Sequence, residues 1–236
     1  MKLSFSCCST FGCLLLALAA AQTASADLIA DGGFESPVVG PSGYQTGFQT
    51  FTVGQTFGNA WTVVGSPTGN VASYQNTETI GNPPTPLNVY QGSQALDLTG
   101  NTDNGAAVGV EQTVATTPGT QYTLTYAYGA LPSQPVSVLV SINGVTVQTA
   151  NLSLSGSGYG TTWDTNSLTF TAQTSSTIVG FLDNSPNGTT LAGLDAVSLN
   201  APASNSAVPE PAAWTLLAAG GMVLVLLRKK FAVNSR

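Results

Sequence analysis

The chain has 236 residues, of which only 7% are charged, and its formal net charge is −6. Its five basic residues lie near the two ends, so no Lys or Arg occurs between Leu3 and Leu227, and His is absent throughout. A long segment without a cationic side chain cannot neutralise phosphates, which excludes nucleic-acid binding, and it cannot build a Ser-His triad, a metal–His site or a phosphate clamp.

The N-terminal segment has the three parts of a secretion signal in the expected order. Lys2 supplies the positive charge, residues 11–21 form an apolar run, and Ala24 and Ala26 provide small residues for cleavage before Asp27. A short buried helix would not explain this order of charge, apolar run and cleavage site. We therefore expect signal peptidase to remove the segment and the rest of the chain to be exported.

All three cysteines of the chain lie inside this removable segment, at positions 7, 8 and 13. The mature protein therefore has no thiol, which excludes disulfides, zinc–thiolate sites and cysteine nucleophiles. Because residues 27–227 also contain no Lys, Arg or His, this part of the chain cannot stabilise itself by ion pairs between side chains. A bound cation such as Ca²⁺ is then the natural partner for any carboxylates that lie close together.

The exported segment predicts a series of short β-strands. Apolar residues alternate with other residues along 122–128 and 136–142, and the turn Asn143-Gly144 joins the second run to 145–147. Further strands are expected at 95–98, 108–114, 167–172, 178–182 and 196–199. Many short strands with polar turns predict an all-β fold, specifically an antiparallel β-sandwich.

The stretch 65–91 has the weakest strand pattern of this segment. Its sequence Asn82-Pro83-Pro84-Thr85-Pro86 argues against a central strand, because Pro donates no backbone hydrogen bond. We expect a long loop here, either a functional rim or a flexible connection, and we favour the flexible connection.

Short motifs follow one another along the exported segment. They are Asp31-Gly32-Gly33-Phe34-Glu35-Ser36-Pro37 with Trp61 downstream, Gly92-Ser93-Gln94-Ala95-Leu96-Asp97-Leu98, Glu111-Gln112-Thr113-Val114, Pro118-Gly119-Thr120-Gln121-Tyr122, Trp163 with Phe170-Thr171-Ala172, and Leu194-Asp195-Ala196-Val197-Ser198-Leu199. In this order they resemble the DUF642 and related choice-of-anchor surface domains, over most of residues 28–200. The resemblance implies a galactose-binding-like jelly roll of two sheets, related to carbohydrate-binding modules, with residues 31–37 as its opening strand.

Two carboxylates are candidates for a metal site. Glu35 is expected at the start of the first strand and Asp195 at the start of the last, and these strands can lie side by side in a jelly roll. An acidic pair without a basic partner is costly unless a cation joins it. The resemblance to carbohydrate-binding modules implies a structural Ca²⁺ here, with the backbone carbonyl of Gly33 as a further ligand. The alternative is that both carboxylates accept backbone N–H bonds and bind no metal.

Sugar binding requires exposed aromatic rings beside amide and carboxylate groups. Tyr74, Tyr90 and Trp163 are the candidates, because each has Gln, Asn or Asp as a sequence neighbour and lies in or beside an expected loop. The alternative for Trp163, as for Trp61, is burial in the sandwich core, which is the usual place for aromatic residues on strands.

Little in the sequence supports catalysis. Without His, Lys, Arg or a mature Cys, the remaining route is a pair of carboxylates that hydrolyses a glycoside, and no pair is marked by its sequence context. We therefore expect the protein not to be an enzyme.

The C-terminal tail combines an extended motif, an apolar run and a basic cluster. Val208-Pro209-Glu210-Pro211 precedes the apolar residues 212–227, which are followed by Arg228-Lys229-Lys230. Sixteen helical residues span roughly 24 Å, which is short for a permanent anchor but sufficient for a transient one. The basic cluster should remain in the cytoplasm, which leaves the upstream segment outside.

This tail closely resembles the PEP-CTERM sorting signal of Gram-negative bacteria. The resemblance implies processing by an exosortase, a transient membrane anchor, and delivery to the cell surface or the extracellular matrix. The alternative is an ordinary C-terminal membrane anchor with the same topology.

The expected organisation is a signal helix, one β-sandwich ectodomain, a linker and a sorting tail with a short transmembrane helix. The corresponding ranges are 1–26, 27–200, 201–207 and 208–236, with the transmembrane segment at 212–227. The favoured function is a non-catalytic domain that binds carbohydrate or matrix polysaccharide. The alternatives are a structural biofilm-matrix component without a specific ligand and, more remotely, a glycoside hydrolase.

Overall fold

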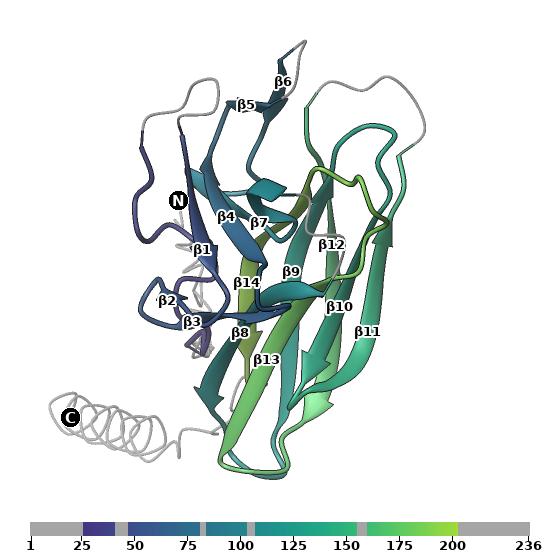
Figure 1. Cartoon of the computed structure of the whole chain (residues 1–236). Helices are drawn as coiled ribbons and strands as arrows, with labels where there is room; N and C mark the ends of the chain where they lie inside the picture. The colour runs from purple at the N-terminus through teal and green to yellow at the C-terminus, as the bar shows by residue number, and fades with distance from the viewer. Residues whose placement is uncertain (1–25, 41–46, 81–83, 103–106, 155–159, 203–236) are drawn as a thin grey trace, which may run out of the picture. The chain divides into compact units, whose positions relative to one another are not determined.

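The computed structural model shows a β-sandwich built from two six-stranded antiparallel sheets (Figure 1). The structure describes residues 26–40, 47–80, 84–102, 107–154 and 160–202. Within these ranges there is no α-helix, and no helix is long and apolar enough to cross a membrane. The all-β prediction is therefore confirmed, whereas the predicted signal segment, sorting motif and transmembrane segment lie outside the described residues.

The first sheet contains the strands that position the candidate site. All of its neighbouring strands pair antiparallel. Its order is β1 (Phe48–Thr52), β4 (Asn70–Gln75), β7 (Gln94–Asp97), β14 (Ala192–Asn200), β9 (Gln121–Ala130) and β12 (Thr162–Thr171).

The second sheet packs against the first and closes the sandwich. Its order is β11 (Val145–Leu152), β10 (Val136–Ile142), β13 (Ser176–Asp183), β8 (Val108–Ala115), β3 (Trp61–Gly65) and β2 (Thr56–Phe57). Two further short strands, β5 (Glu78–Ile80) and β6 (Thr85–Leu87), form a separate hairpin, and a single 3₁₀ turn, η1 (Gly100–Thr102), follows β7.

Alternating apolar residues of both sheets fill the core between them. Trp61 is fully buried there, with its ring 5.3 Å from that of Phe34 and 6.3 Å from that of Phe181. Its indole N–H donates to the backbone carbonyl of Asp31 at 2.9 Å, which satisfies the polar atom of this large buried ring. The prediction that Trp61 belongs to the sandwich core is confirmed.

Each strand predicted from alternation occurs, as β7 to β14, with bounds that differ by a few residues. The Asn143-Gly144 turn is also confirmed, because both residues have positive φ, 51° and 76°, and join β10 to β11. The predicted opening strand at 31–37 is wrong, because these residues form a turn followed by irregular backbone. The Asp31 carboxylate accepts the backbone N–H groups of Glu35 and Ser36, which draws the chain into a local loop instead of a ladder.

The expected flexible loop at 65–91 is also wrong. It contains the six-residue strand β4 and the hairpin of β5 and β6. Pro86 lies on β6 opposite Thr79, and β6 pairs on one side only, so its missing N–H does not interrupt a central ladder.

The outer face of the first sheet carries a second apolar cluster. Its buried members are Tyr74, Leu87, Ala95, Leu131 and Leu191. Leu87 comes from the β5–β6 hairpin, which shows that this hairpin covers part of a sheet face that is usually exposed in a two-sheet sandwich. The cover creates an enclosed space above the sheet.

Candidate functional site

The segment Asn88–Ser93, which we call the strap, lies against the outer face of the first sheet. At one end, the Trp163 indole N–H donates to the carbonyl of Asn88 at 2.9 Å. Beyond it, the backbone N–H groups of Tyr90 and Gln91 donate to Oδ2 of Asp195 at 3.0 and 2.9 Å. Carboxylates bonded to several backbone N–H groups hold a loop firmly, because each bond is charge-assisted.

Glu35 anchors the other end of the strap. Its Oε1 accepts the N–H of Ser93 at 2.7 Å and that of Gln94, the first residue of β7, at 3.2 Å. Gly33 lies beside both acids, because a Cβ at this position would be 3.9 Å from Asp195 Oδ1 and 3.7 Å from Glu35 Cγ. The structure therefore brings Gly33, Glu35 and Asp195 together as predicted.

The placement of Asp195 differs from the prediction in one respect. It lies in the middle of β14, just before a bulge at which Ala196 takes a φ of 48°, and not at the start of the strand. Its Oδ1 accepts the N–H of Ala196 at 2.6 Å, so each of its oxygens accepts at least one backbone bond. Burial raises the pKa of Asp195 to about 6, and the charge of Glu35 contributes to the increase.

Oxygen ligands of this kind suit Ca²⁺, which takes six to eight of them. Two carboxylates supply only part of such a set, and among the described residues no three Asp or Glu side chains are arranged so that they could hold a metal ion together. Gly33 and Glu35 border a hollow of about 340 Å³, whereas Asp195 is fully buried beside it and is not part of its lining. The carboxylate oxygens are of the kind that Ca²⁺ prefers, but the hydrogen bonds from the strap already account for how both acids are stabilised.

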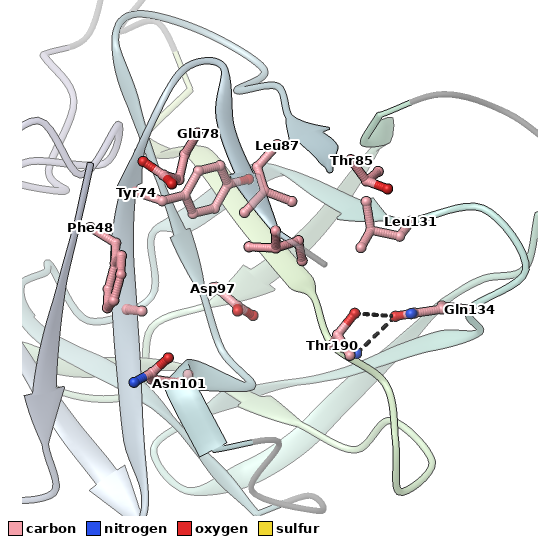
Figure 2. A pocket seen from close by; sticks show the side chains of 13 residues that line it. Phe48, Tyr74, Glu78, Thr85, Leu87, Asp97, Asn101, Leu131, Gln134 and Thr190 are labelled. Carbon is pink, nitrogen blue, oxygen red and sulfur yellow. Dashed lines mark hydrogen bonds between the residues drawn. The ribbon is translucent and has the colours of Figure 1, made fainter. Parts of the chain in front are cut away.

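The covered sheet face contains a cavity of about 390 Å³ (Figure 2). Its floor comes from β1, β4 and β7, its roof from the β5–β6 hairpin, and its far wall from the segments after β9 and before β14. It is lined by Phe48, Ala72, Tyr74, Glu78, Ile80, Thr85, Leu87, Asp97, Gly100, Asn101, Leu131, Gln134 and Thr190.

Asp97 lies at the floor of this cavity and is 6% exposed. Its Oδ1 accepts three hydrogen bonds, two from Thr99 at 2.8 and 2.9 Å and one from the N–H of Ala192 at 3.0 Å. Among the described residues none donates to Oδ2, so this oxygen is the one available to a ligand. Burial raises the pKa of Asp97 to about 7, against the opposing effect of these hydrogen bonds.

Other polar groups surround Asp97. Glu78 is buried and its Oε2 accepts the N–H of Gly47 at 2.6 Å. The hydroxyl of Tyr74 is also buried, and burial together with the charges of Asp97 and Asp195 raises the pKa of Tyr74 well above its usual value. Opposite them, the Gln134 amide oxygen accepts the N–H and the hydroxyl of Thr190 at 2.8 and 2.9 Å. Carboxylate, amide and hydroxyl groups thus converge between apolar walls.

The three aromatic candidates have different environments. Tyr74 is 1% exposed and forms part of the cavity wall, so it lies on a strand and not in a loop. Tyr90 is 47% exposed on the strap, as predicted, with its ring centroid 6.1 Å from that of Trp163. Trp163 is half-buried on the outer face of the first sheet, outside the main core.

The cavity acids were not predicted as site residues. Asp97 follows Ala95 and Leu96 in a short apolar strand, and an acid in such a strand is an available signal for a functional group. Glu78, Asn101, Gln134 and Thr190 occur in segments without a recognisable pattern. Only the tertiary fold brings these residues together, so no local sequence pattern indicates them.

The profile of the family described as "Protein of unknown function (DUF642)" matches residues 27–199. The chain belongs to the DUF642 family. This confirms the resemblance seen in the motifs of the exported segment. No curated protein matches the chain.

Solved structures with a similar fold include enzymes and carbohydrate-binding modules. The Stig cyclase Fisc from Fischerella sp. TAU, in complex with an indole compound, has a TM-score of 0.48 and 17% identity over 76% of this chain and 98% of its own. A family 35 carbohydrate binding module from Clostridium thermocellum has a TM-score of 0.40 and 14% identity over 64% and 97%. TmCBM61 in complex with beta-1,4-galactotriose has a TM-score of 0.40 and 16% identity over 75% and 100%.

The expectation that this DUF642 protein is not an enzyme needs correction. Structures of the same general fold include cyclases as well as carbohydrate-binding modules, so a fold of this kind does not exclude catalysis. The composition of residues 27–227 excludes only chemistry that requires His, Cys or a cationic side chain. Buried carboxylates and hydroxyls remain, and the cavity contains both.

Proposed function

We propose that this protein binds carbohydrate and that the cavity above β4 and β7 holds a sugar. The observation that carries the proposal is the lining of the cavity, where carboxylate, amide and hydroxyl groups face a space with apolar walls. Its volume of about 390 Å³ lies within the range of small-molecule sites.

The chemistry of the lining favours a neutral, hydroxyl-rich ligand. The Tyr74 hydroxyl is a buried polar group without a hydrogen-bond partner among the described residues, and sugar hydroxyls provide donors as well as acceptors. Phe48, Leu87 and Leu131 offer apolar surface to the C–H faces of a ring. An anionic ligand is disfavoured because the segment between Leu3 and Leu227 has no cationic side chain to pair with it.

A glycan array with the full chain, purified in mild detergent, tests this proposal. Asp97→Asn keeps Oδ1 as an acceptor for its three donors but changes the group that faces the ligand, so we expect affinity to fall by about tenfold or more. Glu111→Gln on β8 of the second sheet removes one acidic charge outside the cavity and should bind like the wild type. Uniformly flat binding across neutral glycans would contradict the proposal.

Glycoside hydrolysis is a second candidate function, favoured by the presence of Glu78 and Asp97 in one cavity. A buried acid with a pKa of about 7 is largely protonated below neutral pH and can act as a general acid. Release of reducing sugar from a polysaccharide panel, lost in both Glu78→Gln and Asp97→Asn, would support this candidate. Binding without release would leave carbohydrate recognition as the function.

We also propose that the protein is exported and sorted by an exosortase to the surface or matrix of a Gram-negative cell. The ordered signal segment and the Pro209-Glu210-Pro211 tail support this part of the proposal. Cell fractionation should find wild-type protein at the surface or in the matrix. Glu210→Ala should retain it in the membrane, and an unchanged distribution of this variant would contradict exosortase processing.

A further inference from the structure

A second hollow lies on the same sheet face as the cavity, on the other side of the strap. This groove has a volume of about 630 Å³. It is lined by Tyr90, Gln91, Thr125, Tyr126, Ala127, Thr165, Asn166, Ser167, Ala196 and Ser198.

The strand register places the groove beside the cavity. Asp97 of the cavity pairs with Gly193, Gly193 with Gly129, and Gly129 with Trp163, so these four residues form one row across four strands. Paired residues in a sheet point to the same face. The rows that line the groove lie two and four residues further along the strands, which is about 7 and 13 Å from the row of Asp97.

The next two rows contain the groove residues. Asp195 pairs with Ala127 and Ala127 with Thr165, while Ser198 pairs with Thr125 and Thr125 with Ser167. Asp195 is covered by the strap, whose N–H groups it binds. The strap thus separates two hollows that share one sheet face, and a single extended ligand could reach both.

The groove lining is uncharged. It offers hydroxyls from Thr125, Thr165, Ser167 and Ser198 and amides from Gln91 and Asn166. It differs in this respect from the cavity, which contains two buried acids. Hydroxyl and amide groups without charge suit a neutral polyhydroxylated chain better than an ionic ligand.

Tyr90 gives the groove an aromatic platform. Within the described part of the chain, four large apolar side chains are exposed, and Tyr90 is the one aromatic residue among them. Its backbone N–H is bound to Asp195, and its ring rests against Trp163 at an interplanar angle of 56°. A ring that is already ordered loses little entropy when a sugar stacks on it.

Two glycines allow Trp163 to support this ring. A Cβ at Gly129 would lie 2.9 Å from Cδ2 of Trp163, and a Cβ at Gly193 would lie 2.8 Å from Cη2. Larger residues at these positions would therefore lift the indole off the sheet. The platform is therefore a packed arrangement of several residues.

We propose that the groove is a second subsite for the same glycan chain. One sugar of the chain occupies the cavity, the following sugars lie in the groove, and one of these stacks on Tyr90. This inference rests on the proposed function. It predicts that affinity increases with chain length and that Tyr90 contributes only when the chain is long enough to pass the strap.

The test uses the full chain and oligosaccharides of one to six residues from β-1,4-galactan, β-1,4-glucan, β-1,4-mannan and α-1,4-glucan. Tyr90→Ala retains the backbone N–H that holds the strap, so we expect about tenfold weaker binding of the longest oligomers and unchanged binding of the shortest ones. Tyr90→Phe keeps the ring and should bind as the wild type does. Val147→Ala, which removes an exposed apolar side chain on β11, is the matched control.

The outcomes separate this inference from the proposed function. If wild-type protein binds none of the oligomers, the proposed function fails and the inference fails with it. If wild-type protein binds but Tyr90→Ala binds every length equally well, only the second subsite is wrong. Equal losses for short and long oligomers would also contradict it, because Tyr90 would then act on the cavity alone.

Discussion

The carboxylate of Glu35 occupies the space in which a side chain at position 92 would lie. Gly92 has a φ of 69°, and a Cβ built on it would overlap Oε1 of Glu35. This same oxygen accepts the N–H groups of Ser93 and Gln94. Glycine at 92 is therefore required both by the backbone conformation and by the acid that anchors the strap.

Replacing Gly92 by Ala should detach the strap at this end. We expect the free energy of unfolding to fall by about 2–4 kcal/mol, from the left-handed backbone conformation and from hydrogen bonds to Glu35 that are lost. Urea denaturation measures this change. Gly144→Ala is the matched control, because Gly144 has a φ of 76° and no atom within 4 Å of a built Cβ. It should cost only about 1–2 kcal/mol, and equal losses in the two variants would show that Glu35 is not displaced.

The stability of the domain should depend on pH through Asp97. Its pKa is raised from 3.8 to about 7 in the folded protein, so the folded state binds the proton more tightly than the unfolded state does. The unfavourable burial of the ionised form develops as pH rises from about 4 to about 7, and stability is lost over this range. Asp195, with a pKa raised to about 6, acts in the same direction.

We therefore expect the wild-type melting temperature to be several degrees higher at pH 5 than at pH 8. One kcal/mol corresponds to about 2–4 °C for a domain of this size. Asp97→Asn cannot ionise and should show a smaller decrease over the same interval. Glu111→Gln should retain the wild-type profile. A profile of Asp97→Asn that coincides with that of the wild type would contradict burial of an ionisable Asp97.

The strands that sequence alone predicted are those in which apolar and polar residues alternate with one face toward the main core, as along β9 and β10. The strands and turns it missed have other causes. Residues 31–37 form a turn followed by irregular backbone because the Asp31 carboxylate captures local N–H groups, and β4 has no simple alternation because both faces are buried, one by the core and one by the hairpin. The cavity was not predicted from the sequence for the same reason, because it exists only where the β5–β6 hairpin covers the sheet.

The cluster of Gly33, Glu35 and Asp195, which we call the acidic corner, was predictable for a different reason. Glu35 and Asp195 are acids without basic partners in the exported segment, and such groups need another source of stabilisation. Sequence reasoning placed Gly33, Glu35 and Asp195 together but could not provide the donors, which come from the backbone of the strap. Those N–H groups carry no side-chain signal, so a local sequence pattern cannot show them.

Calcium binding at this corner stays a prediction, and its test separates an ion site from a hydrogen-bonded anchor. We expect Ca²⁺ to raise the melting temperature and EDTA to reverse the increase, because binding to the folded state alone stabilises it. Glu35→Gln retains an amide oxygen for Ser93 and Gln94 but removes a charge, so it should lose the response to Ca²⁺ more completely than it loses stability. No response of the wild type to EDTA would leave the corner as an anchor only.

Two tryptophans provide a matched comparison of core and strap. Trp61 and Trp163 each donate an indole hydrogen bond of 2.9 Å to a backbone carbonyl, but Trp61 is fully buried in the main core and Trp163 is half-buried beside the strap. Trp61→Phe leaves a cavity and removes one of the two hydrogen bonds to the Asp31 carbonyl, so we expect a loss of about 2–4 kcal/mol in the free energy of unfolding.

Trp163→Phe should cost only about 1 kcal/mol globally, because the lost hydrogen bond is near the surface. Its main effect should be local. Asn88 loses its anchor and Tyr90 loses part of its support, so the backbone amides of Tyr90 and Gln91 should exchange with deuterium faster. In Trp61→Phe the exchange of these amides should increase only as far as the lower free energy of unfolding of the whole domain requires. Unchanged exchange at the strap in Trp163→Phe would show that Asp195 and Glu35 are sufficient to hold it.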